Sequence, residues 1–397
     1  MKPTRIPSLD GLRAISILCV IAGHLGAGPA LGTFGVNVFF VISGYLITSL
    51  LQNEQDASGR INLLAFYLRR SFRIFPASFA FIGFTALMAP SARPDLLYAV
   101  TYTMSYHMDK SSQLLSHLWS LSVEEQFYLL WPLALVLAFR RRSRIAIAVM
   151  LLSAAFRLGC SIVSPDQMLR MLHFSFPGVA DSIAAGCLLA IYEPAIKERR
   201  ALVRHMGALA LSLPMVALGL AFALWNGTFP PLGEASHPWI AAVWGVIPLV
   251  IAFWIFTVVQ RRDWILNNPI ASAIGALSYS LYLWQQPFTV GHKGPILGSM
   301  LLLCGFALLS YGLIEKPMIR LGAELAKRDR ASRAQVVDVP FSGPECSHYQ
   351  AGSHSVIPDK PLAIGAQVAY QKSHVLAEEQ GIKNQEWVTA IKDAVEP

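Results

Sequence analysis

Apolar segments of about 20 residues follow one another along the chain as far as residue 314, separated by shorter polar segments. A helix of about 20 residues crosses the hydrocarbon core of a bilayer, which is about 30 Å thick. We therefore predict transmembrane helices, the sixth of which is interrupted by Pro177 and Asp181. The ten predicted helices cover residues 12–31, 35–51, 72–89, 118–139, 145–163, 174–191, 206–225, 239–259, 270–288 and 296–314.

The distribution of Lys and Arg tests this count, because short cytoplasmic loops of membrane proteins are enriched in positive charge. With a cytoplasmic N-terminus, the inner segments hold 23 Lys and Arg residues. The outer segments hold only Arg93, Lys110, Arg170 and Lys293. The sequence therefore predicts an all-α integral membrane protein with ten transmembrane helices and both termini in the cytoplasm.

The composition excludes several other classes of protein. Hydrophobic residues make up 54% of the chain and charged residues 14%, whereas soluble domains average about 25% charged residues. The net charge of +8 follows from the inner loops and does not indicate a nucleic-acid-binding surface. The five cysteines form no CxxC pair, so neither a zinc site nor a disulfide framework is indicated.

The chain changes character after residue 333. From residue 334 onward it holds four Lys against eight Asp and Glu, and four prolines interrupt its first half. We therefore predict two domains, a transmembrane domain of residues 1–333 and a small soluble acidic tail of residues 334–397. The tail contains no recognisable catalytic pattern.

Two ionisable residues of the first predicted helix are candidates for a functional site, because such residues are costly inside a membrane. Arg13 and His24 are eleven residues apart, and at about 100° and 1.5 Å per residue they share one helix face, separated by about 16 Å. Two simpler interpretations remain open. His24 could be a neutral imidazole bonded to a neighbouring helix, and Arg13 an interfacial anchor.

A second candidate is a run of arginines before the third predicted helix. Arg69, Arg70 and Arg73 are spaced to cluster on one side of a helix, where guanidinium groups can bind a phosphate bidentately. The alternative is ordinary positive charge at the cytoplasmic boundary. That alternative does not explain why Arg73 stands directly at the edge of the apolar segment.

Two adjacent carboxylates, Glu124 and Glu125, lie near the outer start of the fourth predicted helix. Neighbouring residues of a helix point about 100° apart, so only one of the two can face the interior. Glu124 shares a face with the aromatic residues at positions 127, 128 and 131, so we expect it to be the inward one. For the remaining deep charges, Arg157 and Asp181, we expect a structural ion pair.

Common catalytic motifs are absent from the sequence. There is no GxSxG, HExxH, Walker loop or GxGxxG motif, so serine-hydrolase, zincin, ATPase and dinucleotide-binding functions lack support. A candidate base, a cluster of arginines and an inward carboxylate would suit acyl transfer by direct attack. We expect no metal site.

Six strings in the chain closely resemble the membrane acyltransferase-3 family, whose members are ten-helix enzymes that O-acylate sugars, cell-envelope polysaccharides and macrolides. The resemblance covers residues 8–321, with the strings in the family's order and spacing. The strings are SLDGLRAISILCVIAGH (8–24), FFVISGYLI (39–47), YLRRSFRIFPA (67–77), HLWSLSVEEQFYLLWP (117–132), SYSLYLW (278–284) and IEKP (314–317).

The resemblance implies that His24 is the catalytic histidine and that Glu124 is the family's characteristic acid. We expect Glu124 to be a second catalytic residue, which orients the acceptor hydroxyl on the outer side or handles its proton. Asn37 and Gln285 depart from the pattern, since many members have Asp and His at these positions. The residues implied in binding acyl-CoA, the co-substrate, from the cytoplasm are Arg13, Arg69, Arg70 and Arg73.

The expected function is therefore that of an O-acyltransferase in the cell inner membrane. It would transfer an acyl group, most simply acetyl from acetyl-CoA, to a hydroxyl of a carbohydrate such as a cell-envelope polysaccharide or a lipid-linked glycan. Two alternatives remain open at this point. One is an acyltransferase for a diffusible acceptor such as a macrolide, and the other is a glycan transporter or flippase.

Overall fold

The computed structural model describes residues 6–107, 113–163, 174–198, 219, 238–261, 266–291 and 295–337. All the regular elements among these residues are helices. The long ones are α1 (Pro7–Ala22), α2 (Pro29–Ser58), α3 (Leu63–Met88), α6 (Leu118–Ala138), α7 (Arg142–Val163), α9 (Phe176–Glu198), α12 (Pro238–Arg261), α13 (Pro269–Trp284), α15 (Ile296–Ser310) and α16 (Lys316–Val337).

Six helical segments of the described chain are long and apolar enough to cross a membrane. They are Pro7–Ala27, Pro29–Ser58, Leu63–Met88, Gln113–Cys160, Phe176–Glu198 and Ile296–Arg330. An all-helical, multi-pass membrane protein is therefore confirmed, whereas the count of ten and the position of both termini stay predictions. The seventh predicted helix, residues 206–225, lies outside the described residues except for residue 219.

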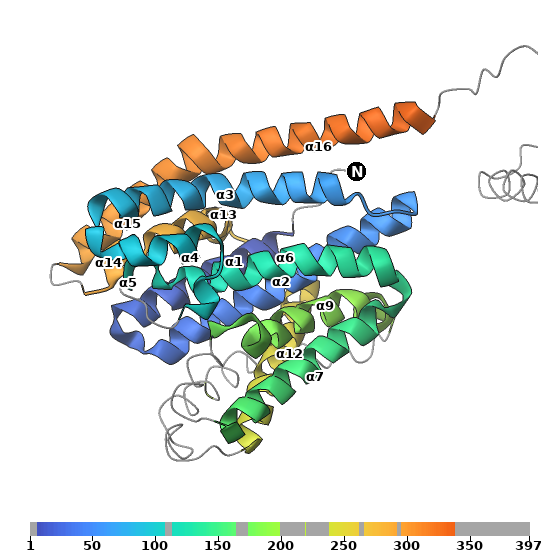
Figure 1. The fold of residues 1–397 in the computed structure, drawn as a ribbon, viewed down its shortest axis with the longest axis horizontal. Coiled ribbons are helices and arrows are strands. Elements are labelled where there is room, and N and C mark those ends of the chain that lie inside the picture. Colours follow the sequence, from blue (N-terminus) through green and yellow to red (C-terminus); the bar gives the residue numbers. More distant parts are fainter. Residues whose placement is uncertain are drawn as a thin grey trace, which may run out of the picture. The chain divides into compact units, whose positions relative to one another are not determined.

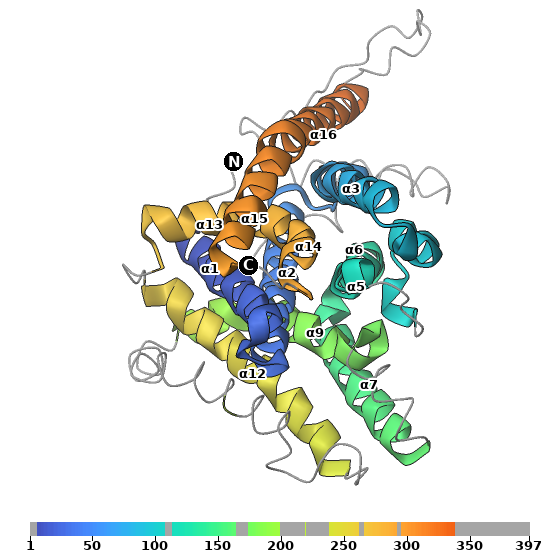
Figure 2. The ribbon, with the colours of Figure 1, turned by 90° about the vertical axis from the view of Figure 1, so that its left-hand side faces the viewer.

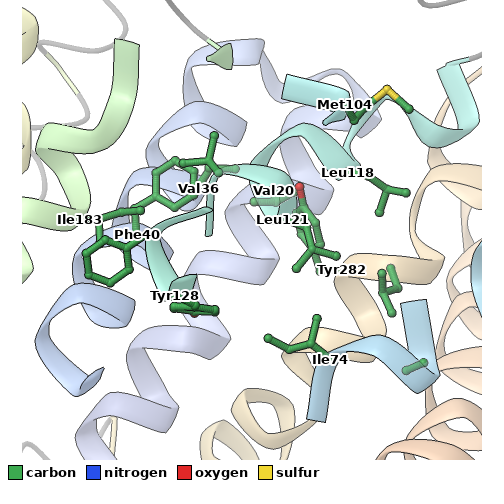
Figure 3. Close-up of a cluster of buried hydrophobic side chains, with 14 of the residues drawn as sticks. Val20, Val36, Phe40, Ile74, Met104, Leu118, Leu121, Tyr128, Ile183 and Tyr282 are labelled. Carbon is green, nitrogen blue, oxygen red and sulfur yellow. The ribbon is translucent and has the colours of Figure 1, made fainter. Parts of the chain in front are cut away.

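Most of the closely packed helix pairs are distant in sequence. Helix α1 contacts α2 and α13, α2 also contacts α9, and α16 lies along α3 (Figures 1 and 2). Many of these helices contribute to one apolar cluster, part of which is shown in Figure 3. Its members include Val20 of α1, Val36 of α2, Ile74 of α3, Leu121 of α6 and Tyr282 of α13.

Helix α3 begins at Leu63 rather than at residue 72, where the apolar segment suggested. Asn62 caps the helix, because its side-chain oxygen accepts a hydrogen bond of 3.0 Å from the backbone N–H of Ala65. The arginines at positions 69, 70 and 73 therefore lie inside a helix, two to three turns from its start.

Helix α1 ends in a π-helical turn, Gly23–Ala27, rather than continuing to residue 31. Gly26 and Gly28 have φ values of 105° and 112°, which side chains other than glycine rarely adopt. Pro29 then starts α2, in the first helical position where proline fits best. His24 lies on this turn, so the shared-face calculation for Arg13 and His24 holds only as far as Ala22.

The buried ion pair expected between α7 and α9 is confirmed. Arg157 Nη2 lies 2.6 Å from Asp181 Oδ2, and Arg157 Nη1 donates to the carbonyl oxygen of Gly178 at 2.7 Å. Both side chains are buried. The pair keeps two charges of opposite sign together in the apolar interior, where either would be costly alone.

Helices α2 and α9 cross closely at two glycines, Gly44 and Gly186. A Cβ atom at Gly44 would collide with the carbonyl oxygen of Ile183, and one at Gly186 with that of Val41. Small residues allow such close approach of membrane helices. This crossing fixes the position of α2, which contributes residues to the cavities described below.

We expect Gly44→Leu to destabilise the protein by about 1–3 kcal/mol or more, because a side chain there must force two backbones apart. Thermal unfolding of the purified protein in detergent measures the effect. Gly83→Leu is the matched control, since a Cβ atom at Gly83 of α3 meets no atom within 4 Å. Equal unfolding temperatures for the two variants would contradict the proposed crossing.

The predicted tail lies almost entirely outside the described residues. Helix α16 continues through Val337, so the first residues after 333 extend this helix. The boundary at residue 333 and the role of the tail stay predictions.

Candidate active site

Two neighbouring cavities lie among the helices. A small one of about 80 Å³ is lined by arginines, and a larger one of about 530 Å³ is lined by His24. Val36 of α2 and Tyr282 of α13 line both cavities. These two side chains therefore form the wall between the cavities, at the helix junction shown in Figure 3.

The small cavity brings together arginines from two helices. Arg13 of α1 and Arg70 and Arg73 of α3 all line it. The three side chains are half-buried, and the Arg70 guanidinium lies over the ring of Tyr128, 5.1 Å from its centre. Three guanidinium groups around one cavity form a site that suits an anionic group such as a phosphate.

Arg69 does not line this cavity. Its Nη2 atom lies 3.9 Å from Glu54 Oε2 of α2, and the same carboxylate accepts a hydrogen bond of 2.7 Å from Arg330 of α16. The structure therefore places Arg69 apart from the three arginines that line the cavity, because Glu54 lies where Arg69 can reach it. A role of Arg69 in binding acyl-CoA stays a prediction.

Glu124 faces the interior, as its position in the sequence predicted, but among the arginines. Its carboxylate accepts hydrogen bonds from the hydroxyls of Ser43, at 2.8 Å, and of Tyr128, at 3.2 Å. It lines the small cavity with Arg13 and Arg70 and does not line the His24 cavity. A carboxylate in this position partly neutralises the guanidinium charges and holds two hydroxyl groups in fixed directions.

His24 lies on the exposed face of the π-helical turn and lines the large cavity. The sequence suggested a base buried within a helix, whereas the structure places the imidazole where molecules can reach it. Histidines at positions 107 and 117, Gln286 and Trp119 also line this cavity. His117 is buried, and its Nε2 lies 3.2 Å from the carbonyl oxygen of Leu283.

Sequence reasoning underestimated two features of the site. Glu315 directly follows the last predicted helix, which ends at residue 314, but it is 1% exposed, accepts a hydrogen bond of 2.8 Å from Ser280, and is an electrostatic partner of Arg73. Tyr282 was not singled out, although it separates the cavities. Its spacing of four and three residues from Ser278 and Tyr279, which line the small cavity with it, is a helical signal that could have identified it.

The two departures from the family pattern have different surroundings. Asn37 accepts a hydrogen bond of 2.9 Å from Ser182, so it connects α2 to α9. Gln285 is fully buried at the junction of α13 and α14 (Gln286–Thr289), and it lines neither of the two cavities. Among the described residues, no group of three or more His, Cys, Asp and Glu could hold a metal ion.

Comparison with known proteins gives consistent matches. A putative O-acetyltransferase of Staphylococcus aureus (strain COL) is 32% identical over 361 residues, covering 81% of this chain and 58% of that protein. The O-acetyltransferase OatA of Staphylococcus aureus (strain NCTC 8325 / PS 47) is 31% identical over 358 residues, with the same coverage.

The chain thus spans somewhat more than half the length of the curated relatives that it matches. No solved structure matches. The model of the acyltransferase-3 family, described as an acyltransferase domain, matches residues 6–314, which include the arginines of the small cavity and His24. The six strings and the cavity geometry agree with this match. The chain therefore belongs to the acyltransferase-3 family.

Proposed function

We propose that the protein transfers an acetyl group from cytoplasmic acetyl-CoA to a hydroxyl of a carbohydrate of the cell envelope, and that it resides in the inner membrane. One observation carries this proposal. A cavity lined by three arginines adjoins a second cavity lined by His24, and only Val36 and Tyr282 line both. Such a pair of sites suits a donor held by its phosphates at one end and used at the other.

In the proposed reaction, His24 acts as a general base. One imidazole nitrogen takes the proton of the acceptor hydroxyl while the hydroxyl oxygen attacks the thioester carbonyl carbon. The carbon–sulfur bond then breaks, and the departing thiolate of coenzyme A takes the proton from the imidazolium. Atoms and charge balance, and no further reactant is needed.

The arginines bind the phosphates of the donor in this scheme. Arg13, Arg70 and Arg73 can each donate hydrogen bonds to phosphate oxygens, and bound phosphates would leave the pantetheine arm to extend past Tyr282 towards His24. Glu124 is a positioning residue in this proposal. It holds Tyr128, over whose ring the Arg70 guanidinium lies, and so orients that guanidinium.

Acetyl as the transferred group is supported by the names of the relatives, which are O-acetyltransferases. A carbohydrate acceptor is supported by the lining of the His24 cavity, which combines hydrogen-bonding side chains with the ring of Trp119. The Trp119 ring is held edge to face by Phe174, 4.9 Å away between ring centres. Polar groups next to an aromatic face suit a molecule with many hydroxyls.

The test is mass spectrometry of envelope glycans from strains with and without the protein. We expect glycans from the strain with the protein to be heavier by the mass of acetyl groups, which mild alkali removes. A strain that expresses a His24→Ala variant is the control for the presence of the protein itself. Identical glycan masses in all three strains would refute the carbohydrate acceptor.

A further inference from the structure

The segment between α3 and α6 forms part of the wall of the His24 cavity. Its first part, residues 89–107, contains three short helices, η2 (Pro90–Asp95), α4 (Leu96–Val100) and η3 (Met104–Tyr106), and His107 directly follows η3. Ser105 and His107 line the cavity with His24. This segment therefore brings a second imidazole to the place where the acceptor is proposed to bind.

The His107 ring is fixed from two directions. Its Nε2 lies 2.8 Å from Oδ1 of Asp95, and the Asp95 side chain is fully buried. The ring of Tyr98 stacks on the imidazole with 3.9 Å between ring centres and 11° between planes. A buried carboxylate and a stacked ring, both from the same short segment, hold this imidazole in one orientation.

The carboxylate also determines the role of the two ring nitrogens. With Asp95 as the partner, Nε2 carries a proton and donates a hydrogen bond to the carboxylate oxygen. In the neutral ring the other nitrogen, Nδ1, is a hydrogen-bond acceptor. A hydroxyl group is a suitable donor to such a nitrogen, and hydroxyl groups are what the proposed acceptor carries.

We propose that His107, held by Asp95, binds a hydroxyl of the carbohydrate acceptor and so orients a different hydroxyl towards His24. This inference rests on the proposed function, to which it adds a binding residue for the acceptor. His107 is a binding residue and not the base. His107 positions the acceptor, so its loss raises the half-saturating concentration of the acceptor and leaves that of acetyl-CoA unchanged.

A purely structural role makes a different prediction. If the pair of His107 and Asp95 only stabilises the segment, the loss of His107 lowers the unfolding temperature and reduces activity at all concentrations of both substrates. If His107 binds the acceptor, the half-saturating concentration of the acceptor alone changes. The two roles are therefore separable by kinetics and thermal unfolding.

The experiment uses the full chain in lipid nanodiscs, labelled acetyl-CoA, and de-O-acetylated envelope polysaccharide from a source strain that lacks the protein. We expect His107→Ala to raise the half-saturating polysaccharide concentration by about 3- to 10-fold, the effect of one lost hydrogen bond. The half-saturating acetyl-CoA concentration and the unfolding temperature should match those of the parent. His107→Gln, which keeps an amide oxygen as acceptor, should recover part of the loss.

Leu97→Ala is the control in the same segment, because Leu97 is 70% exposed and does not line the cavity, so its half-saturating polysaccharide concentration should match that of the parent. An unchanged half-saturating polysaccharide concentration in His107→Ala would overturn the inference while leaving the proposed function intact. A lowered unfolding temperature with a uniform loss of activity would assign His107 a structural role instead. Absence of transfer by the parent protein would refute the proposed function, and the inference with it.

Discussion

Replacing His24 by alanine is expected to reduce acetyl transfer by about 10²- to 10⁴-fold, the usual contribution of a general base. The effect on folding should be small, because His24 lies exposed on the π-helical turn and its loss leaves no cavity in a packed core. Expression and membrane insertion should therefore stay close to those of the parent. Incorporation of labelled acetyl groups into envelope polysaccharide measures the effect.

A second variant at the same position separates the loss of the base from the loss of a hydrogen bond. His24→Asn keeps a polar side chain that can bond to an acceptor hydroxyl, but it cannot take a proton at neutral pH. We expect it to be as inactive as His24→Ala. Parental activity in either variant would show that the proton goes elsewhere.

Replacing Arg73 by lysine is expected to raise the half-saturating acetyl-CoA concentration by about tenfold, although the positive charge is kept. Lysine cannot reproduce the planar, bidentate geometry of a guanidinium group, and hydrogen bonds to charged partners contribute about 1.5–3 kcal/mol each. Arg73 lines the small cavity together with Arg13 and Arg70, where the donor phosphates are proposed to bind. Initial rates at several acetyl-CoA concentrations measure the effect.

Arg69→Lys is the matched control for this prediction. It makes the same chemical change four residues earlier on the same helix, but Arg69 is directed to Glu54 and does not line the cavity. We expect its half-saturating acetyl-CoA concentration to equal that of the parent. If both variants behave alike, the arginines act through their charge at the membrane surface and not as a phosphate site.

The helical architecture could be predicted because apolar segments of membrane length leave few other structures. The pairing of Arg157 with Asp181 followed from opposite charges on neighbouring segments, and the structure confirms it. The inward direction of Glu124 followed from the aromatic residues on its helix face. Each of these inferences needed only local spacing and the cost of burying charge.

The start of α3 and the neighbours of its arginines were harder to predict. The apolar segment begins near residue 72, but α3 starts at Leu63. Arg70 and Arg73 line the small cavity together with Glu124, which the sequence had placed near the outer start of its helix. Which arginine lines the cavity depended on Glu54, a residue of another helix, and no spacing within the arginine run could show this.

The contact of Asp95 with His107 was also beyond sequence reasoning. The two residues are twelve positions apart in a segment without a periodic pattern, and three short helices bring them together. The π-helical turn at His24 contains Gly26 and ends at Gly28. The positive φ values of these glycines could not be inferred from the sequence. Such sites are built by irregular segments, where hydrophobic periodicity gives no information.

We propose that one protein accepts the acetyl group from the cytoplasmic side and delivers it to an acceptor on the other side. The most direct measurement uses sealed inside-out vesicles that contain the protein, with labelled acetyl-CoA outside and de-O-acetylated polysaccharide trapped in the lumen. We expect label on the luminal polysaccharide, and none with the His24→Ala variant. Label only on polysaccharide added outside the vesicles, on the donor side, would contradict it.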